Sequence, residues 1–255
     1  PEGIDHWALT QDMLARLGSI DPEWRDGLIY HVLVKWAQAG RYSPDEYRAM
    51  LDTVLDEQHL FLGLGERNTD SVFMRSFSVL VSTLPVYYHR LSPYLTPHEV
   101  RSTLTQVLKY LSQEKDWRGY VEVKGWAHAA AHSADVIDEL AQCEEIEREG
   151  LLQILDGIKA SMSIGDTVFT HEEDERMAYA VLSLIQRGLL IERDIEPWLR
   201  SFAPIDQSGD MRERTRRLNI KNFLRSLFFQ SAQRHIAEWI TVPINETLYA
   251  ISNFK

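Results

Sequence analysis

The chain has 255 residues, of which 44% are hydrophobic, and its formal net charge at pH 7 is -11. This composition supplies enough apolar side chains for a packed core, and the negative charge argues against binding to nucleic acid or anionic membranes, which repel an acidic protein. No apolar run approaches the roughly 20 residues of a membrane-spanning helix. Because Cys143 is the single cysteine, no internal disulfide can form, and we expect a cytoplasmic protein.

Apolar residues recur with helical spacing along almost the whole chain, and strand patterns are almost absent. The predicted helices alternate between shorter segments, at 5–17, 44–60, 97–112, 145–161 and 193–202, and longer segments, at 22–39, 71–91, 119–141, 171–189 and 211–234. The longer helices start 40 to 52 residues apart, close to the period of HEAT or armadillo arrays. We therefore expect an all-α fold, a right-handed α-solenoid of about five helix pairs that forms one helical-repeat domain over residues 1–255.

Several of these helices begin with capping signals. Residues 43–46 (SPDE) and 96–99 (TPHE) are capping boxes with proline at the first helical position. Asp70 is expected to cap the predicted helix at 71–91. Thr170 is expected to cap the predicted helix at 171–189, with Glu173 completing a capping box. The acidic first turn of that helix suits the helix dipole, and paired carboxylates for acid/base work are the alternative interpretation.

The predicted helix at 119–141 carries the most informative pattern. On a helical projection His128, His132 and Asp135 share one stripe, and Trp126 lies on the opposite, apolar side. Two histidines four residues apart can bind one zinc ion, so a divalent metal held by His128, His132 and Asp135 is one hypothesis. Ala129 stands where the metalloprotease motif requires glutamate. The other hypothesis is a set of polar groove residues that hydrogen-bond to neighbours or to a ligand.

Polar side chains also lie opposite the apolar stripe on the other long helices. By analogy with solenoid arrays, these helices line the concave face, and we expect a polar groove there that binds a small polar ligand or a peptide. The expected ligand contacts are His128, His132, Asp135, Arg75, Glu172, Arg176 and Asn222. Arg75 is suited to bind a carboxylate or phosphate through two hydrogen bonds, and a salt bridge to a neighbouring repeat is the alternative.

The strongest concentration of basic residues lies at 212–217 (RERTRR), with Lys221 and Arg225 following it. A solvated helix that offsets nearby acids explains this block, and a local anion contact is the alternative. No aromatic residues are interleaved with the block, which argues against stacking on nucleic-acid bases.

Five stretches are distinctive in their order along the chain: residues 70–78 (DSVFMRSFS), 114–121 (EKDWRGYV), 125–135 (GWAHAAAHSAD), 173–176 (EDER) and 222–229 (NFLRSLFF). Together they resemble an uncharacterised all-helical bacterial family that is known only as a domain of unknown function. The resemblance runs from about residue 20 to about residue 235, and Ser133 stands where we expect glycine in relatives. It implies the helical fold and the location of the site, and it implies no reaction.

Two further functions compete with a binding groove. One is a metal-assisted or acid/base hydrolase, with Asp135 or Glu172 as base and Arg75 as anion clamp. The other is a structural protein–protein adaptor, which predicts an exposed apolar strip instead of a polar pocket. The nucleophile elbow, the phosphate-binding loop and the dinucleotide fingerprint do not occur in the sequence.

Overall fold

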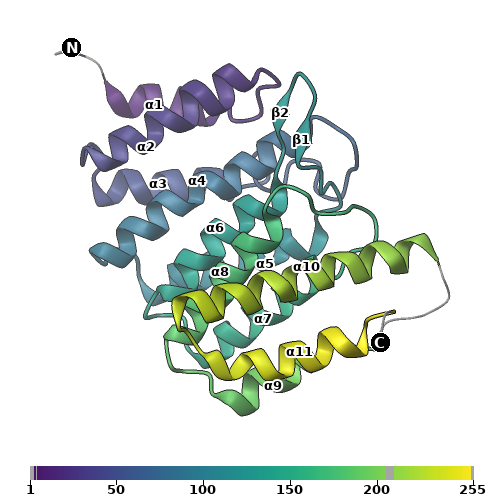
Figure 1. Cartoon of the computed structure of the whole chain (residues 1–255). Coiled ribbons are helices and arrows are strands. Elements are labelled where there is room, and N and C mark those ends of the chain that lie inside the picture. The colour runs from purple at the N-terminus through teal and green to yellow at the C-terminus, as the bar shows by residue number, and fades with distance from the viewer. Residues whose placement is uncertain (1–2, 4, 205–209, 254–255) are drawn as a thin grey trace. The chain divides into compact units, whose positions relative to one another are not determined.

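The computed structural model describes residues 3, 5–204 and 210–253, which are mainly helical (Figure 1). The chain divides into two compact units, Pro1–Glu139 and Leu140–Lys255. Within the described residues no helix is long and apolar enough to cross a membrane. Because the described residues form helices and one two-stranded sheet, the predicted all-α fold class is confirmed. The stacking of helix pairs into a solenoid and the single domain over 1–255 stay predictions.

The first unit is built around one long helix, α4, most of whose residues are buried and which packs against α3. Its elements are α1 (His6–Leu14), the π-helix η1 (Glu23–Tyr30), α2 (His31–Gln38), α3 (Pro44–Val54), α4 (Ser71–Leu91), α5 (Pro97–Gln113), β1 (Tyr120–Val121), β2 (Gly125–Trp126) and the greater part of α6 (Ala129–Gln142). The observed bounds of α4 agree with the predicted helix at 71–91.

The second unit is organised around α10, which packs against α8 and α11. After the end of α6 its elements are α7 (Arg148–Met162), α8 (Glu173–Gln186), α9 (Glu192–Arg200), α10 (Met211–Arg234), the 3-10 helix η2 (Glu238–Ile240) and α11 (Thr241–Ala250). Figure 1 shows α10 and α11 running alongside each other near the C-terminus. The prediction of α10 is confirmed, whereas α11 lies beyond the last helix that the sequence predicts.

Both predicted capping boxes are present. The Ser43 hydroxyl accepts from the backbone of Glu46, and the Glu46 carboxylate accepts from the backbone of Ser43. Thr96 and Glu99 form the same pair at the start of α5. The backbone hydrogen bond from Thr96, with further bonds from the Thr96 hydroxyl and Arg48, lowers the pKa of Glu99 to about 2. These local signals fix helix starts without help from the tertiary fold.

The two other predicted caps are wrong. The Asp70 side chain makes no capping hydrogen bond, and it instead holds Lys124 in an ion pair. Thr170 lies before the helix, because α8 begins only at Glu173, after Glu172 in the left-handed conformation with a φ of 68°. The Glu173 carboxylate accepts from the backbone N–H of His171 at 2.7 Å.

The predicted helix at 119–141 is wrong over residues 119–128, where β1 and β2 form a short antiparallel hairpin ahead of α6. Val123, Gly125 and His128 have φ angles of 69°, 75° and 53°, which a right-handed helix does not allow. A Cβ atom at position 125 would lie 2.7 Å from the Cβ of Pro22, so glycine permits this close approach. Contacts with a distant segment therefore decide the local structure.

The hairpin changes the predicted orientation of two residues. Trp126 lies on β2 with 37% of its surface exposed, so its assignment to the buried face of a helix is wrong. His128 precedes α6, and its carbonyl accepts from the backbone N–H of His132 in the first turn. The apolar face of α6 itself is predicted correctly, since Val136, Ile137 and Leu140 are buried.

Candidate functional site

His132 lies in the first turn of α6 and contacts α4. Its Nδ1 is 3.1 Å from the carbonyl oxygen of Ser76, and its ring meets the Phe77 ring edge-on with centroids 5.0 Å apart. Because a carbonyl oxygen can only accept a hydrogen bond, Nδ1 carries the proton and donates it. In the neutral imidazole Nε2 is then the nitrogen able to accept a proton or bind a metal.

His128 contacts the hairpin on one side and His132 on the other. Its ring stacks on Trp126 with centroids 4.7 Å apart, and the centroids of the two imidazoles are 5.6 Å apart. Both imidazoles are buried, with 7% of His128 and 6% of His132 exposed, whereas Asp135 is half-buried on α6. The two histidines are thus held by packing against aromatic rings, which restricts their rotation.

No group of three or more His, Cys, Asp or Glu side chains among the described residues is arranged to hold a metal ion. A divalent metal at His128, His132 and Asp135 stays a prediction. Three further expected ligand contacts belong to the second unit: Glu172 is exposed just before α8, Arg176 is exposed on α8, and Asn222 is half-buried on α10.

Arg75 and Glu114 form a fully buried ion pair. The Arg75 Nε and Nη2 atoms donate to the two Glu114 carboxylate oxygens at 2.7 and 2.9 Å. Arg75 Nη1 donates to the Leu62 carbonyl at 2.9 Å, the Gly63 carbonyl at 3.2 Å and the Ser71 hydroxyl at 2.8 Å. Burial acts to lower the pKa of Arg75, but the hydrogen bonds and charge of Glu114 raise it overall. The salt bridge left open by the sequence is therefore confirmed, and Arg75 does not face a groove.

Two serines on the same stripe of α4 are also buried. The Ser78 hydroxyl donates to the Met74 carbonyl, and the Ser82 hydroxyl donates to the Val79 carbonyl, each at 2.6 Å. Helical periodicity identifies which side chains are polar, but it does not show whether they face solvent. On α4 these polar side chains form their hydrogen bonds inside the protein.

The loop before α4 is fixed by the segment that follows α5. The Asp116 carboxylate accepts the backbone N–H of Asn68 at 2.8 Å and two Arg118 nitrogens at 2.7 and 2.6 Å. Arg118 also donates to the Thr69 carbonyl at 2.7 Å, and Glu114 accepts the backbone N–H of Asp116 at 2.8 Å. The buried ion pair and this second pair share one segment, so together they position the start of α4.

Arg25 ties η1 to the hairpin. It is fully buried and donates to the Ser19 carbonyl at 2.6 Å, the Lys124 carbonyl at 2.7 Å and the Trp126 carbonyl at 3.2 Å. Its guanidinium carbon lies 4.3 Å from the centroid of the Phe73 ring on α4. Burial lowers the pKa of Arg25. Three backbone carbonyls, the Asp26 carboxylate at 3.3 Å and an aromatic face offset part of its lost hydration.

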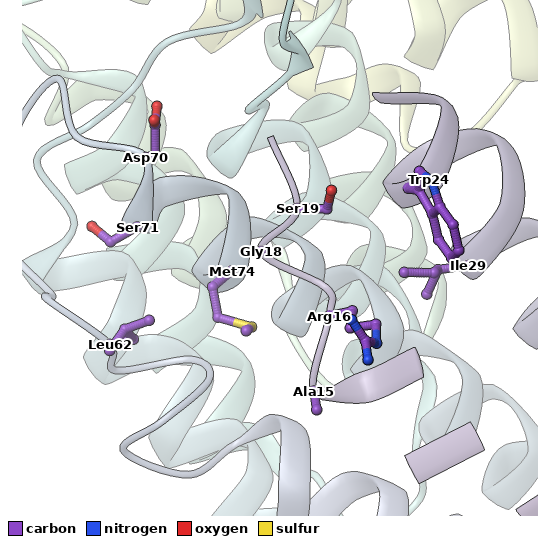
Figure 2. A pocket seen from close by; sticks show the side chains of 10 residues that line it. All are labelled: Ala15, Arg16, Gly18, Ser19, Trp24, Ile29, Leu62, Asp70, Ser71 and Met74. Carbon is purple, nitrogen blue, oxygen red and sulfur yellow. The ribbon is translucent and has the colours of Figure 1, made fainter. Parts of the chain in front are cut away.

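A pocket of about 700 Å³ opens in the first unit among the segment after α1, η1 and the start of α4 (Figure 2). It is lined by Ala15, Arg16, Gly18, Ser19, Trp24, Ile29, Leu62, Asp70, Ser71 and Met74. Figure 2 shows Arg16, Trp24 and Ile29 on one side, and Leu62, Asp70 and Ser71 on the other. A Cβ atom at Gly18 would lie 3.1 Å from the Met74 Cβ, so glycine lets this segment approach α4 closely.

The polar groups of this pocket differ in how they are compensated. Asp70 accepts the Lys124 Nζ at 2.7 and 2.8 Å, and the Ser71 hydroxyl donates to Glu66 at 2.8 Å. The hydrogen bonds from Ser71 and Thr69 lower the pKa of Glu66. Arg16 is exposed, and its side chain has no hydrogen bond or ion pair with any residue that the structure describes. Arg16 is therefore the charged side chain of the pocket lining that has no ionic partner within the described part of the chain.

Sequence reasoning did not identify Arg16 or Trp24 as site residues. Neither residue belongs to a motif, and the pocket combines residues from three segments of the chain. The signal nearest to them is the Gly18–Ser19 turn, which ends the first predicted helix and brings the segment against α4.

A second pocket, of about 750 Å³, lies in the second unit. It is lined by Ile185, Leu190, Ile191, Glu192, Arg193, Glu196 and Trp239. Its lining contains two carboxylates, Glu192 and Glu196, beside the guanidinium of Arg193. This mixture of charges favours neither an anionic nor a cationic ligand.

The comparisons with known proteins give a family and no activity. The sequence profile of a family described as "Protein of unknown function (DUF2785)" matches residues 60–229. The matched range includes α4, the Arg75–Glu114 pair and both histidines. No curated protein and no solved structure matches the chain significantly.

Proposed function

The chain belongs to the DUF2785 family, whose function is unknown, and we propose that it binds a small molecule with an apolar body and one anionic group in the pocket of the first unit. Its volume of about 700 Å³ falls within the range of small-molecule sites. The observation that carries the proposal is Arg16, a guanidinium without an ionic partner among the described residues, in a lining that includes Trp24, Ile29, Leu62 and Met74.

The chemistry of this lining favours an anion over a cation or a neutral ligand. A guanidinium binds a carboxylate, sulfonate or phosphate through two parallel hydrogen bonds. Asp70 does not oppose such a ligand strongly, because its charge is balanced by Lys124. Half of the Trp24 surface is exposed, at 53%, so a flat apolar group gains contact area against the indole.

Binding can be tested with anilinonaphthalene sulfonate, a fluorescent probe with an aromatic body and one sulfonate. We expect Arg16→Gln to weaken its binding roughly tenfold, the equivalent of one charge-assisted hydrogen bond. Ala15→Trp is expected to abolish binding, because Ala15 is an exposed residue of the lining and a large side chain there fills the pocket. Arg101→Gln, which removes an exposed arginine from α5 away from the pocket, is the matched control.

Near-UV circular dichroism of each variant separates lost binding from lost folding. The proposal fails if folded Ala15→Trp binds the probe like the unaltered protein, or if Arg16→Gln and Arg101→Gln behave alike.

The site predicted from the sequence supports a second candidate, a metal-assisted or acid/base hydrolase at His128, His132 and Asp135. The hydrogen bond from Nδ1 of His132 to the Ser76 carbonyl favours it, because metal-binding histidines are commonly oriented by such a bond. Stoichiometric zinc in protein purified without a His-tag, lost in His132→Gln, would support this candidate. Metal-free protein that does not bind added zinc chloride contradicts the metal-assisted form.

The wider expectations belong to the same proposal. A right-handed α-solenoid with a polar groove, to which Glu172, Arg176 and Asn222 would contribute, rests on the spacing of the helix pairs and on their polar stripes. A cytoplasmic location rests on the single cysteine.

A further inference from the structure

The outer face of α10 carries positive charges that pair with no carboxylate of the residues that the structure describes. Arg212 pairs with Asp166, and Arg216 pairs with Glu213. The remaining cations between Met211 and Arg225 form a strip, here called the basic strip, that consists of Arg214, Arg217, Lys221 and Arg225. In the described part of the chain, Arg217 contacts the neutral Asn253, and the other three side chains have no hydrogen bond or ion pair.

The spacing of the basic strip places its members on one face. They are three or four residues apart, which is the separation of neighbours on a helix surface, and the strip extends over about 16 Å. Burial together with the charges of Arg225 and Arg217 lowers the pKa of Lys221. Mutual repulsion is thus present along the strip, in a chain whose net charge is -11.

Apolar side chains follow the same outer face. Met211, Leu218 and Phe229 are 68%, 41% and 59% exposed, and they are separated by seven and eleven residues, which aligns them beside the basic strip. The inner face of α10 is a separate, fully buried stripe of Ile220, Phe223, Leu224 and Leu227. The exposed apolar residues are therefore not needed for the core of the unit.

We propose that this outer face docks an acidic amphipathic helical segment of a partner protein. Its carboxylates would pair with the basic strip, and its apolar side chains would contact Leu218 and Phe229. Helical segments bind in this way through anchors that recur every three, four or seven residues. Three of the four cations are arginines, which suit bidentate pairing with carboxylates.

Net charge favours a short segment over an extended polyanion. A membrane or a nucleic acid reaches beyond the strip and meets the acidic remainder of the protein, with repulsion effective over a screening length of about 8 Å. A segment as long as the strip avoids most of that repulsion. This inference concerns a helix of the second unit and does not depend on the pocket of the first unit.

The test compares two double variants that remove the same charge from the same helix. Lys221→Gln with Arg225→Gln removes two members of the basic strip, whereas Arg212→Gln with Arg216→Gln removes two arginines that already have acidic partners. The probe is a labelled amphipathic peptide of about 20 residues with glutamate along one helical ridge and leucine along the next. Fluorescence anisotropy measures its affinity for the full chain.

We expect the peptide to bind, with an affinity that falls as salt rises, and the strip variant to bind it roughly tenfold more weakly than the control variant. Leu218→Ala is expected to weaken binding with no change in its salt dependence. The proposal is overturned if the peptide does not bind, if both double variants lose affinity equally, or if phosphatidylserine vesicles or oligo(dT) bind more tightly than the peptide.

Discussion

Two loops lead into long helices of this protein, one before α4 in the first unit and one before α8 in the second, and they are stabilised by different chemistry. The first loop is held by charged groups: Arg75 binds the Leu62 carbonyl, Arg118 binds the Thr69 carbonyl, and Asp116 binds the Asn68 N–H. Each of these charged side chains has a partner of opposite charge: Arg75 pairs with Glu114, and Arg118 pairs with Asp116.

In the second loop, three backbone groups are bound by one buried neutral side chain, and the ion pair of this loop, Arg212 with Asp166, is partly exposed. The buried Asn219 of α10 donates to the Ile164 and Thr167 carbonyls at 3.1 and 2.8 Å, and its oxygen accepts the Phe169 N–H at 3.1 Å. A Cβ atom at Gly165 would lie 2.6 Å from the Arg212 carbonyl oxygen, so this loop also approaches the α10 backbone closely.

Charged side chains in the first loop and an amide side chain in the second both bind backbone N–H and carbonyl groups, but losing one of them destabilises the protein to a different degree. An amide is desolvated at modest cost, and its loss leaves a few neutral groups without partners. A buried ion pair is desolvated at high cost, and loss of one member leaves a buried charge. The first unit should therefore be far more sensitive to single substitutions at its loop than the second.

The largest effect is expected from Arg75→Met. It leaves the Glu114 carboxylate buried without its guanidinium partner, and we expect unfolding free energy to fall by about 3–5 kcal/mol in urea denaturation. Combining it with Glu114→Gln should restore part of the loss, because the buried charge is then removed as well. A loss below about 1 kcal/mol for Arg75→Met would break the comparison.

Asn219→Leu should have a smaller effect. Leucine fills a similar volume but leaves two carbonyls and one N–H of the loop without their partner, so we expect a loss of about 2 kcal/mol. Urea denaturation monitored by far-UV circular dichroism measures it. If Asn219→Leu lowered the unfolding free energy as much as Arg75→Met, removing a buried amide would be as destabilising as removing a buried charge.

The helices could be predicted because their signals are local. The capping box at Thr96 and the apolar periodicity of α4 and α10 depend only on neighbouring residues, and both long helices begin and end where predicted. The hairpin could not be predicted in this way. Its positive φ at Gly125 is tied to the close approach of Pro22, which lies about a hundred residues away along the chain.

The candidate site was less predictable than the fold. Periodicity placed Arg75 opposite an apolar stripe, but it could not distinguish an open groove from a buried partner, and Glu114 comes from 39 residues away. The pocket at Arg16 joins three separate segments, so no spacing within one helix indicates it. Conversely, the spacing of His128 and His132 is evident from the sequence, yet the environment of His132 depends on Phe77 and Ser76 of another helix.

Trp126→Ala tests what secures the hairpin, whose Lys124 holds Asp70 at the end of the first loop. On the apolar face of a helix, this substitution would cost about 3–5 kcal/mol. On the half-exposed hairpin, the substitution removes the stacking on His128 and the edge-on contact with Tyr120, and we expect a loss of about 1 kcal/mol, measured as a small shift in the urea midpoint. A loss above about 3 kcal/mol would show that the aromatic contact, rather than Arg25 and Arg118, secures the hairpin to the first unit.

Lys124→Met is expected to have the smallest effect. It removes an exposed ion pair of the first loop, and comparing it with Arg75→Met tests whether burial of the charge causes the sensitivity of this loop. Lys124 pairs with Asp70 at the end of the first loop with good geometry, but the two side chains are 37% and 45% exposed. Water screens an ion pair of this kind, so its removal should change the unfolding free energy by less than about 1 kcal/mol. Asp70→Asn, measured in the same way, is the reciprocal control. If either substitution were as damaging as Arg75→Met, charge alone rather than buried charge would explain the sensitivity of this loop. If both are mild, the risk lies in the desolvated pair beneath it.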